Sequence, residues 1–286
     1  MTTGTAQHSQ AQGRTGEYIA IGLLFSTIAA AIYYFAPTGA IDYNACYAPA
    51  VRELIAGRSP YSVYCFYNPP WMLIPLIPFV LLGSVGYKLL FMARLAAYLF
   101  VIIRLRLPLV AAVLIMVSPP IIGDMAVGNI DWLLPLALVI PQWAGLFLLL
   151  LKPQAGLLLA MFWVIEACRS GGFRVAFRMA APAFAALVLS LAIFGMYPLR
   201  TSEIAFSTWN SSLFPYSVPV CIALLAYAIR HRNENIAAVA SPLISPYLSI
   251  STGSYILPLI GLARTSIKLL AVAVVGMWAF ILLSLV

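Results

Sequence analysis

The chain has 286 residues, of which 63% are hydrophobic and only 8% are charged. Soluble domains carry about a quarter charged residues, so this composition excludes an ordinary soluble domain and indicates an integral membrane protein. The net charge of +8 is typical of basic cytoplasmic loops, and we expect no nucleic-acid partner. The sequence contains no zinc-type spacing of cysteine and histidine, no phosphate-binding loop and no dinucleotide fingerprint, so no cofactor is predicted.

The amino-terminal residues 1–17 are polar, small and aperiodic, which predicts a disordered tail. The first apolar run, residues 18–36, lacks a small-residue cleavage site and is long enough to span a bilayer. We therefore expect a retained membrane helix there, and a single polytopic transmembrane domain over residues 18–286.

Further apolar runs follow along the chain, and several are shorter than the roughly 20 residues that a straight span needs. We predict an all-α integral membrane protein, a polytopic helical bundle of about 9–11 membrane helices that includes short broken or re-entrant segments. The runs lie at 69–83, 86–103, 107–122, 132–151, 154–168, 175–195, 216–229, 236–250, 253–263 and 268–286.

The basic residues between these runs predict the topology, because the positive-inside rule places them on the cytoplasmic face. All of them reach one face only if the proline-rich run 69–83 does not cross and the run 132–151 forms a tight hairpin broken around Pro141. Residues 37–85 and Lys152 are then extracytoplasmic. The basic clusters are Arg104 and Arg106; Arg169, Arg174 and Arg178; Arg230 and Arg232; and Arg264 and Lys268.

The stretch "IDYNACYAPAVRELIAGRSPYSVYCFYNPP" at 41–70 interrupts the apolar chain. Between Tyr43 and Gly57 apolar residues recur at helical spacing, which predicts a short amphipathic helix on the membrane surface, ended by Gly57. Asp42 precedes this helix, where a carboxylate can cap the free amide groups. The functional alternative is that Asp42 is a general base beside a polar cleft.

Of the four cysteines, only Cys46 and Cys65 share a loop. They could form a disulfide if that loop is extracytoplasmic. We favour free thiols in apolar surroundings.

Four segments in order resemble a known family. Asp42 and Tyr43, the pattern "A…L…G…PY" and "YNPP" at 67–70 resemble the first external loop of the GT-C membrane glycosyltransferases, in particular the polyprenyl-phosphate-mannose-dependent α-mannosyltransferases (glycosyltransferase family 87). "GNID" at 128–131 is similar to that family's Gly-Gln-x-Asn segment, with Asn129 in place of Gln and Asp131 in place of Asn. "LKPQAGLLLAMFW" at 151–163 resembles its Lys-Pro motif, and "SPLISPYL" at 241–248 is similar to a late proline-containing helix.

The resemblance implies a GT-C-like fold in the plasma membrane, with the active face extracytoplasmic. It also implies a donor in which mannose, or another hexose or pentose, is carried by a polyprenyl phosphate. Asp42 would deprotonate a hydroxyl of a lipid or glycan acceptor, which attacks the anomeric carbon while the lipid phosphate leaves.

The candidate ligands of the donor phosphate are cationic. Lys152 is the strongest, because an intramembrane lysine is costly and usually marks a site. The alternative is a lysine that snorkels at the hairpin tip. The remaining candidates are Arg52, Arg58 and Arg200.

The candidate ligands of acceptor or sugar are Tyr43, Tyr67, Asp124, Asn129, Asp131 and Gln154. Asp124 and Asp131 flank "GNID" and could hold the acceptor or a divalent metal, although two isolated acids do not indicate a metal site. For Asp131 we favour capping of the following helix, and Asp124 stays open.

Two other functions compete with glycosyl transfer. One is a transporter or flippase of an anionic lipid-linked substrate that uses Lys152 and the broken hairpin, but the internal repeat common in transporters is absent. The other is a non-catalytic GT-C-like subunit, which the short chain favours.

Overall fold

The computed structural model describes residues 18–28, 30, 31, 34, 40–198, 210–250 and 253–284, and these parts are helical and without strands. An apolar helix covers Tyr18–Ile28. The first half continues with η1 (Tyr43–Tyr47), α2 (Ala48–Ile55), η2 (Pro60–Ser62), η3 (Pro70–Leu76), α3 (Ile77–Leu81), α4 (Gly83–Arg104), α5 (Leu109–Met116) and α6 (Pro119–Val127). The second half contains η4 (Asp131–Leu138), α7 (Gln142–Leu149), α8 (Pro153–Phe194), α9 (Val218–His231), α10 (Glu234–Ala240), η6 (Ser241–Ile244), η7 (Gly253–Tyr255), α11 (Ile256–Thr265) and α12 (Ile267–Leu283). The tail predicted at 1–17 lies outside the described residues.

Among the residues that the structure describes, two helices, α4 and α8, are long and apolar enough to cross a membrane. Helices α5 and α6, bent by 48° at their junction, make a third candidate if they form one span. The all-helical fold and the presence of membrane-competent helices are therefore confirmed. The larger number of membrane helices and the GT-C-like bundle stay predictions.

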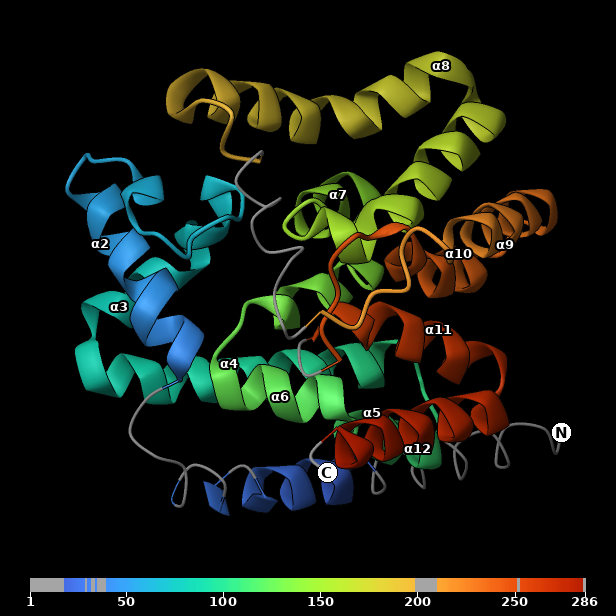
Figure 1. The fold of residues 1–286 in the computed structure, drawn as a ribbon, viewed down its shortest axis with the longest axis horizontal. Helices are drawn as coiled ribbons and strands as arrows, with labels where there is room; N and C mark the ends of the chain where they lie inside the picture. The colour runs from blue at the N-terminus through green and yellow to red at the C-terminus, as the bar shows by residue number, and fades with distance from the viewer. Residues whose placement is uncertain are drawn as a thin grey trace, which may run out of the picture.

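Helix α8 is 42 residues long but contains a break at Gly172, whose φ of 72° lies in the left-handed region. Only glycine adopts this conformation without strain, so the helix turns there. The break falls inside the basic cluster of residues 169–178. This cluster separates the predicted apolar runs 154–168 and 175–195. Figure 1 shows α8 changing direction at this bend.

Both segments that were expected to be broken consist of short helices. The run 69–83 forms η3 and α3, and the chain then reverses at Gly83 (φ 59°) so that α3 packs against α4. The run 132–151 forms η4 and α7, which pack against each other on either side of a break at Val139–Pro141. The break and the packing of the two halves are confirmed, while the position of this hairpin in the membrane stays a prediction.

Three of the four basic clusters come together at one end of the molecule. Glu166 on α8 pairs with Arg169 at 3.1 Å and with Arg232 at 3.5 Å, and Glu234 on α10 pairs with Arg264 at 2.6 Å. In Figure 1 the bend of α8, the α9–α10 turn and the α11–α12 turn all lie toward the right-hand side. This arrangement agrees with a single basic face.

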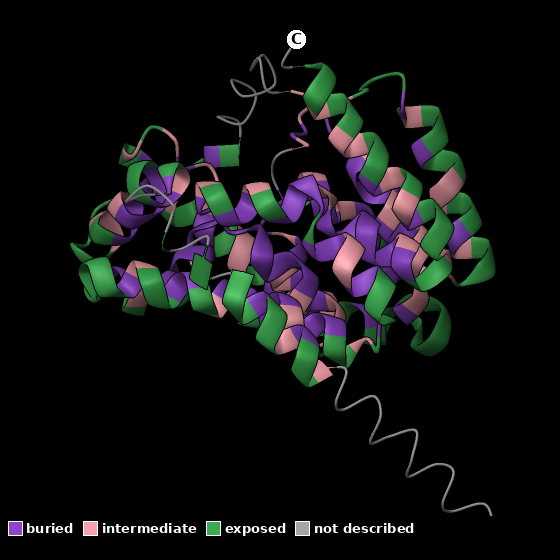
Figure 2. Ribbon diagram, turned by 90° about the horizontal axis from the view of Figure 1, so that it is seen from below, coloured by how far each residue is buried: buried purple, intermediate pink, exposed green. Residues whose placement is uncertain are grey.

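Buried residues gather in the middle of the molecule and exposed ones at its periphery (Figure 2). Many exposed residues are large and apolar, for example Phe173 and Phe177 on α8 and Val272 and Val275 on α12. Such apolar outer surfaces are unusual in soluble monomers and are expected on helices that face lipid.

Candidate active site

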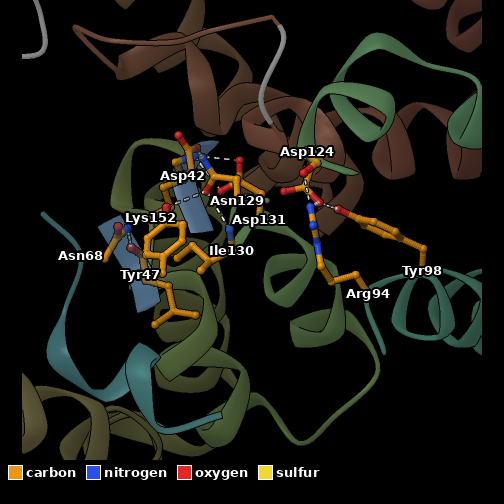
Figure 3. Close-up of polar contacts among 11 residues, drawn as sticks. Asp42, Tyr47, Asn68, Arg94, Tyr98, Asp124, Asn129, Ile130, Asp131 and Lys152 are labelled. Atoms are coloured by element: carbon orange, nitrogen blue, oxygen red, sulfur yellow. Dashed lines mark hydrogen bonds and ion pairs between the residues drawn. The ribbon is translucent and has the colours of Figure 1, made fainter. Parts of the chain in front are cut away.

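The chain contains three aspartates, Asp42, Asp124 and Asp131. Asp42 directly precedes η1, Asp124 lies in the last two turns of α6 and Asp131 begins η4, and the α7–α8 turn brings Lys152 to Asp131 (Figure 3). Because charged residues are rare in this chain, a concentration of them in one buried region marks the strongest candidate for a functional site.

The first loop forms a helix at the residues where the periodicity predicts one, while its placement on the membrane surface stays a prediction. η1 and α2 are continuous from Tyr43 to Ile55, and Gly57 follows with a φ of 71°. Its buried face contains Tyr43, Tyr47, Ala50 and Val51, together with Cys46 and Ala48. This face packs into the protein core, so the helix holds Asp42 against the body of the protein.

Asp42 does not cap this helix, so the capping interpretation is wrong. Its backbone is already helical (φ −65°, ψ −40°), and its side chain makes no capping hydrogen bond. The helical pattern starts earlier, because the Asn44 N–H donates to the Ala40 carbonyl at 2.9 Å. The Asp42 carboxylate instead accepts a hydrogen bond from Asn129 Nδ2 at 2.8 Å.

Asn129 joins the first loop to the α6–η4 turn. Its Oδ1 accepts from the Tyr47 hydroxyl at 3.0 Å and from the Ile130 N–H at 2.8 Å. Gly128, which precedes it, has a φ of 76°, and a Cβ there would lie 2.3 Å from Ala40 Cβ. Glycine therefore permits both the left-handed end of α6 and its close approach to η1.

Lys152 is 8% exposed and its ammonium group is paired with Asp131. Nζ donates to Oδ2 at 2.7 Å and also lies 2.7 Å from Oδ1. The snorkelling interpretation of Lys152 is therefore wrong.

The capping role favoured for Asp131 is also wrong, because Ile130 occupies the N-cap of η4 and no side chain caps it.

The first loop also holds the turn that carries Lys152. Asn68 Nδ2 donates to the Leu151 carbonyl at 2.9 Å, and the Tyr61 hydroxyl donates to the Asn68 carbonyl at 2.9 Å.

Cys46 and Cys65 form a disulfide with their Cα atoms 5.4 Å apart, so the expectation of free thiols is wrong for this pair. The disulfide links the Asp42 helix to the loop that positions Lys152.

Arg94 on α4 is a further buried charge that the sequence interpretation missed. Its Nη2 lies 3.0 Å from Asp124 Oδ2 and also donates to the Asp124 carbonyl, while the Tyr98 hydroxyl donates to Oδ2 at 2.6 Å. Arg94 and Asp124 are both 0% exposed. A lone arginine inside the apolar run 86–103 was the available signal, because such a charge requires a buried partner.

The electrostatic environment of Asp42 suits a base. Burial raises the pKa of the Asp42 carboxyl above its usual range, and nearby Asp131 adds to this rise. Lys152, the Asn129 hydrogen bond and Arg94 oppose it. A carboxylate with a raised pKa is a stronger base at any pH at which it remains ionised.

The other predicted phosphate ligands lie apart from this network. Arg52 is exposed on α2. Arg58 is exposed and bound to Glu53 through two hydrogen bonds of 2.6 and 2.8 Å. Arg200 lies outside the described residues. Lys152 is the predicted phosphate ligand that the structure brings to the three aspartates.

The remaining predicted sugar ligands border the network. Tyr43 is buried with its ring centroid 5.2 Å from that of Tyr87. Tyr67 is half-buried beside Asn68, and Gln154 is half-buried in the first turn of α8, two residues after Lys152. Among the described residues, no group of three or more His, Cys, Asp or Glu side chains could hold a metal ion.

Comparisons with models of protein families, with curated proteins and with solved structures found no match to this chain.

Proposed function

We propose that this protein is a membrane glycosyltransferase that moves a sugar from a polyprenyl-phosphate donor to a hydroxyl of an extracytoplasmic lipid or glycan acceptor. The observation that carries the proposal is the state of the Asp42 carboxylate. It is partly exposed, free of any capping role and held through one oxygen by Asn129, in surroundings that raise its pKa.

The proposed reaction uses Asp42 as general base. Its carboxylate takes the proton of the acceptor hydroxyl as that oxygen forms a bond to the anomeric carbon. The bond between the anomeric carbon and the phosphate oxygen breaks, and the lipid phosphate leaves with the electron pair. Because a phosphate is a good leaving group, one base and one cation suffice for this chemistry.

Lys152 supplies the cation in this proposal. An ammonium group has three N–H donors, and the Asp131 carboxylate lies 2.7 Å from Nζ through each of its two oxygens. A donor phosphate would take an N–H of Lys152 that does not donate to Asp131 and share the charge. Asp131 then keeps the lysine aimed before the donor binds.

The Cys46–Cys65 disulfide supports an extracytoplasmic location for this site, because disulfides persist in oxidising compartments. The gathering of basic residues at one end of the fold supports a cytoplasmic location for that end.

The test is transfer by the purified protein in liposomes, supplied with several radiolabelled polyprenyl-phosphate sugars and a membrane lipid extract as acceptor. We expect label to move into a lipid or glycan product with at least one donor. Glu53→Gln is the matched control, since it removes a half-buried carboxylate of the same loop that pairs with Arg58 and lies outside the Asp42 network. A folded protein that transfers no sugar from any of these donors would contradict the proposal.

A transporter of an anionic lipid-linked substrate is the second candidate. The two buried ion pairs, Arg94 with Asp124 and Lys152 with Asp131, favour it, because such pairs often line transport pathways. The same liposomes separate the two functions. A transporter moves the labelled donor between leaflets without acceptor and leaves its glycosidic bond intact.

A further inference from the structure

Asn129 lies between the proposed base and the protein core, and its orientation is fixed by its neighbours. Two donors, the Tyr47 hydroxyl and the Ile130 N–H, point at its Oδ1 from 3.0 and 2.8 Å. Rotating the amide by half a turn would set its NH₂ group against both donors. The amide therefore has one satisfied orientation, in which Nδ2 faces Asp42.

The donor arrangement stays the same across the working pH range. Burial raises the pKa of the Tyr47 phenol well above its usual range, so Tyr47 keeps its proton and continues to donate. The Ile130 N–H cannot titrate. A chain of donation thus runs one way, from Tyr47 through Asn129 to Asp42.

We infer that Asn129 is a positioning residue for Asp42: it binds Oδ2 and leaves Oδ1 as the oxygen that accepts the proton of the acceptor hydroxyl. This inference rests on the proposed function. It follows from the contacts of Asp42, since Oδ2 receives the Asn129 bond at 2.8 Å, and Oδ1 makes no hydrogen bond with any described residue. Both lone pairs of Asn129 Oδ1 and one of its two Nδ2 hydrogens are engaged within the protein, which supports the positioning role, while the sugar contact expected from the sequence stays a prediction.

Several other charged or titratable groups act on Asp42 from the surrounding elements. Lys152 from the α7–α8 turn and Arg94 from α4 favour its ionised form, and Asp131 from η4 disfavours it. Tyr47 from η1 and Tyr247 from the segment after η6 also interact with it electrostatically. A test of Asn129 must change the Asn129–Asp42 contact and leave these groups in place.

Asn129→Asp meets this requirement. The substituted side chain keeps an acceptor for Tyr47 and Ile130, so the fold is retained, but it turns a carboxylate oxygen toward Asp42 where an N–H had been. Two facing carboxylates cannot both ionise easily, so the pKa of the pair rises. Asn129→Ala removes the donor and the acceptor together. Asn44→Ala is the control, since Asn44 is an exposed asparagine on η1, two residues after Asp42.

The experiment has two readouts. The first is titration of the protein labelled with ¹³C at the aspartate carboxyl carbon, in which the wild type gives three aspartate signals and Asp42→Asn identifies one of them. The second is the transfer rate as a function of pH. We expect both Asn129 variants to raise the Asp42 midpoint, and Asn129→Ala to lower the maximal rate by about a hundredfold through misplacement of the base. Asn44→Ala should change neither.

An Asp42 midpoint that is the same in the wild type and in both folded Asn129 variants would overturn the inference. A maximal rate unchanged in Asn129→Ala would also overturn it. The titration does not depend on the proposed function. If the wild type transferred no sugar and both Asn129 variants still raised the midpoint, the proposed function would fail while the Asn129–Asp42 contact stood.

Discussion

The ammonium group of Lys152 lies 2.7 Å from Asp131, and the two side chains come from the turns at either end of the η4–α7 hairpin. The hairpin closes on itself, so residues 21 positions apart in sequence meet in the interior. Burying either charge alone costs several kcal/mol, so each residue requires the other.

Lys152→Met is expected to destabilise the protein by about 3–5 kcal/mol, because it leaves the Asp131 carboxylate buried without its partner. The double variant Asp131→Asn/Lys152→Met, which removes both charges, should recover most of this loss. Asn is chosen at position 131 because it has nearly the same shape as Asp, and the close approach of Gly253, where a Cβ would lie 2.2 Å from Asp131 Cβ, is then kept. Thermal unfolding midpoints in nanodiscs measure both effects. Equal midpoints for the single and double variants would contradict the pairing.

The Cys46–Cys65 disulfide is expected to stabilise the protein by about 2–4 kcal/mol. The double variant Cys46→Ser/Cys65→Ser should therefore unfold at a lower temperature than the wild type, and reducing agent should lower the wild-type midpoint to a similar value. Cys168→Ser removes a free, exposed thiol and should have little effect. If the reducing agent left the wild-type midpoint unchanged, the disulfide would not contribute to stability.

The topology predicts opposite accessibility at the two ends of the membrane-competent segments. Ser84 is exposed at the start of α4, which we place outside, and Cys168 is exposed beside the basic cluster of α8, which we place inside. A membrane-impermeant maleimide should label Ser84→Cys in intact cells and reach Cys168 only after permeabilisation. Labelling of Cys168 in intact cells, with protection at position 84, would reverse the assigned orientation.

The rate of transfer is expected to fall on the acid side with an apparent pKa above that of an ordinary aspartate. Burial raises the pKa of Asp42, so protons inactivate the base at a higher pH than usual. The contribution of Asp42 to the free energy of unfolding depends on pH in the opposite direction to the rate. Because the pKa of Asp42 is higher in the folded than in the unfolded protein, this contribution is fully present below the unfolded pKa and is lost as the pH rises through the folded pKa. A rate that is constant down to the ordinary aspartate range would contradict Asp42 as a buried base.

Local features of the sequence predicted the local structure well. The helix of the first loop, its buried face from Tyr43 to Val51 and the break near Pro141 follow from periodicity and proline, and the bend of α8 falls in the basic stretch that separates two predicted apolar runs. These properties depend on residues that are close together in the chain, where steric and hydrogen-bonding rules act directly.

The partners of the polar side chains could not be predicted in the same way. Asp42 and Asn129 are 87 positions apart, and Arg94 and Asp124 are 30 apart, so their contacts depend on how the helices pack. Asp42 had the sequence position of a helix cap, and only the earlier helix start at Ala40 shows that it is not one. The Cys46–Cys65 disulfide likewise depends on how the loop folds back onto η1.

Substitution of Asp42 by asparagine tests the central proposal most directly. Asparagine has nearly the same shape and can accept the Asn129 hydrogen bond through its own Oδ1, so Asp42→Asn should keep the wild-type unfolding midpoint. It cannot take a proton from a sugar hydroxyl, so the rate of transfer should fall by roughly a hundredfold or more. The measurement is the initial rate of sugar transfer by the folded variant in liposomes, beside the wild type and Glu53→Gln. A folded, inactive Asp42→Asn protein is the predicted result, and an Asp42→Asn protein that retains most of the wild-type rate would contradict the assignment of Asp42 as the base.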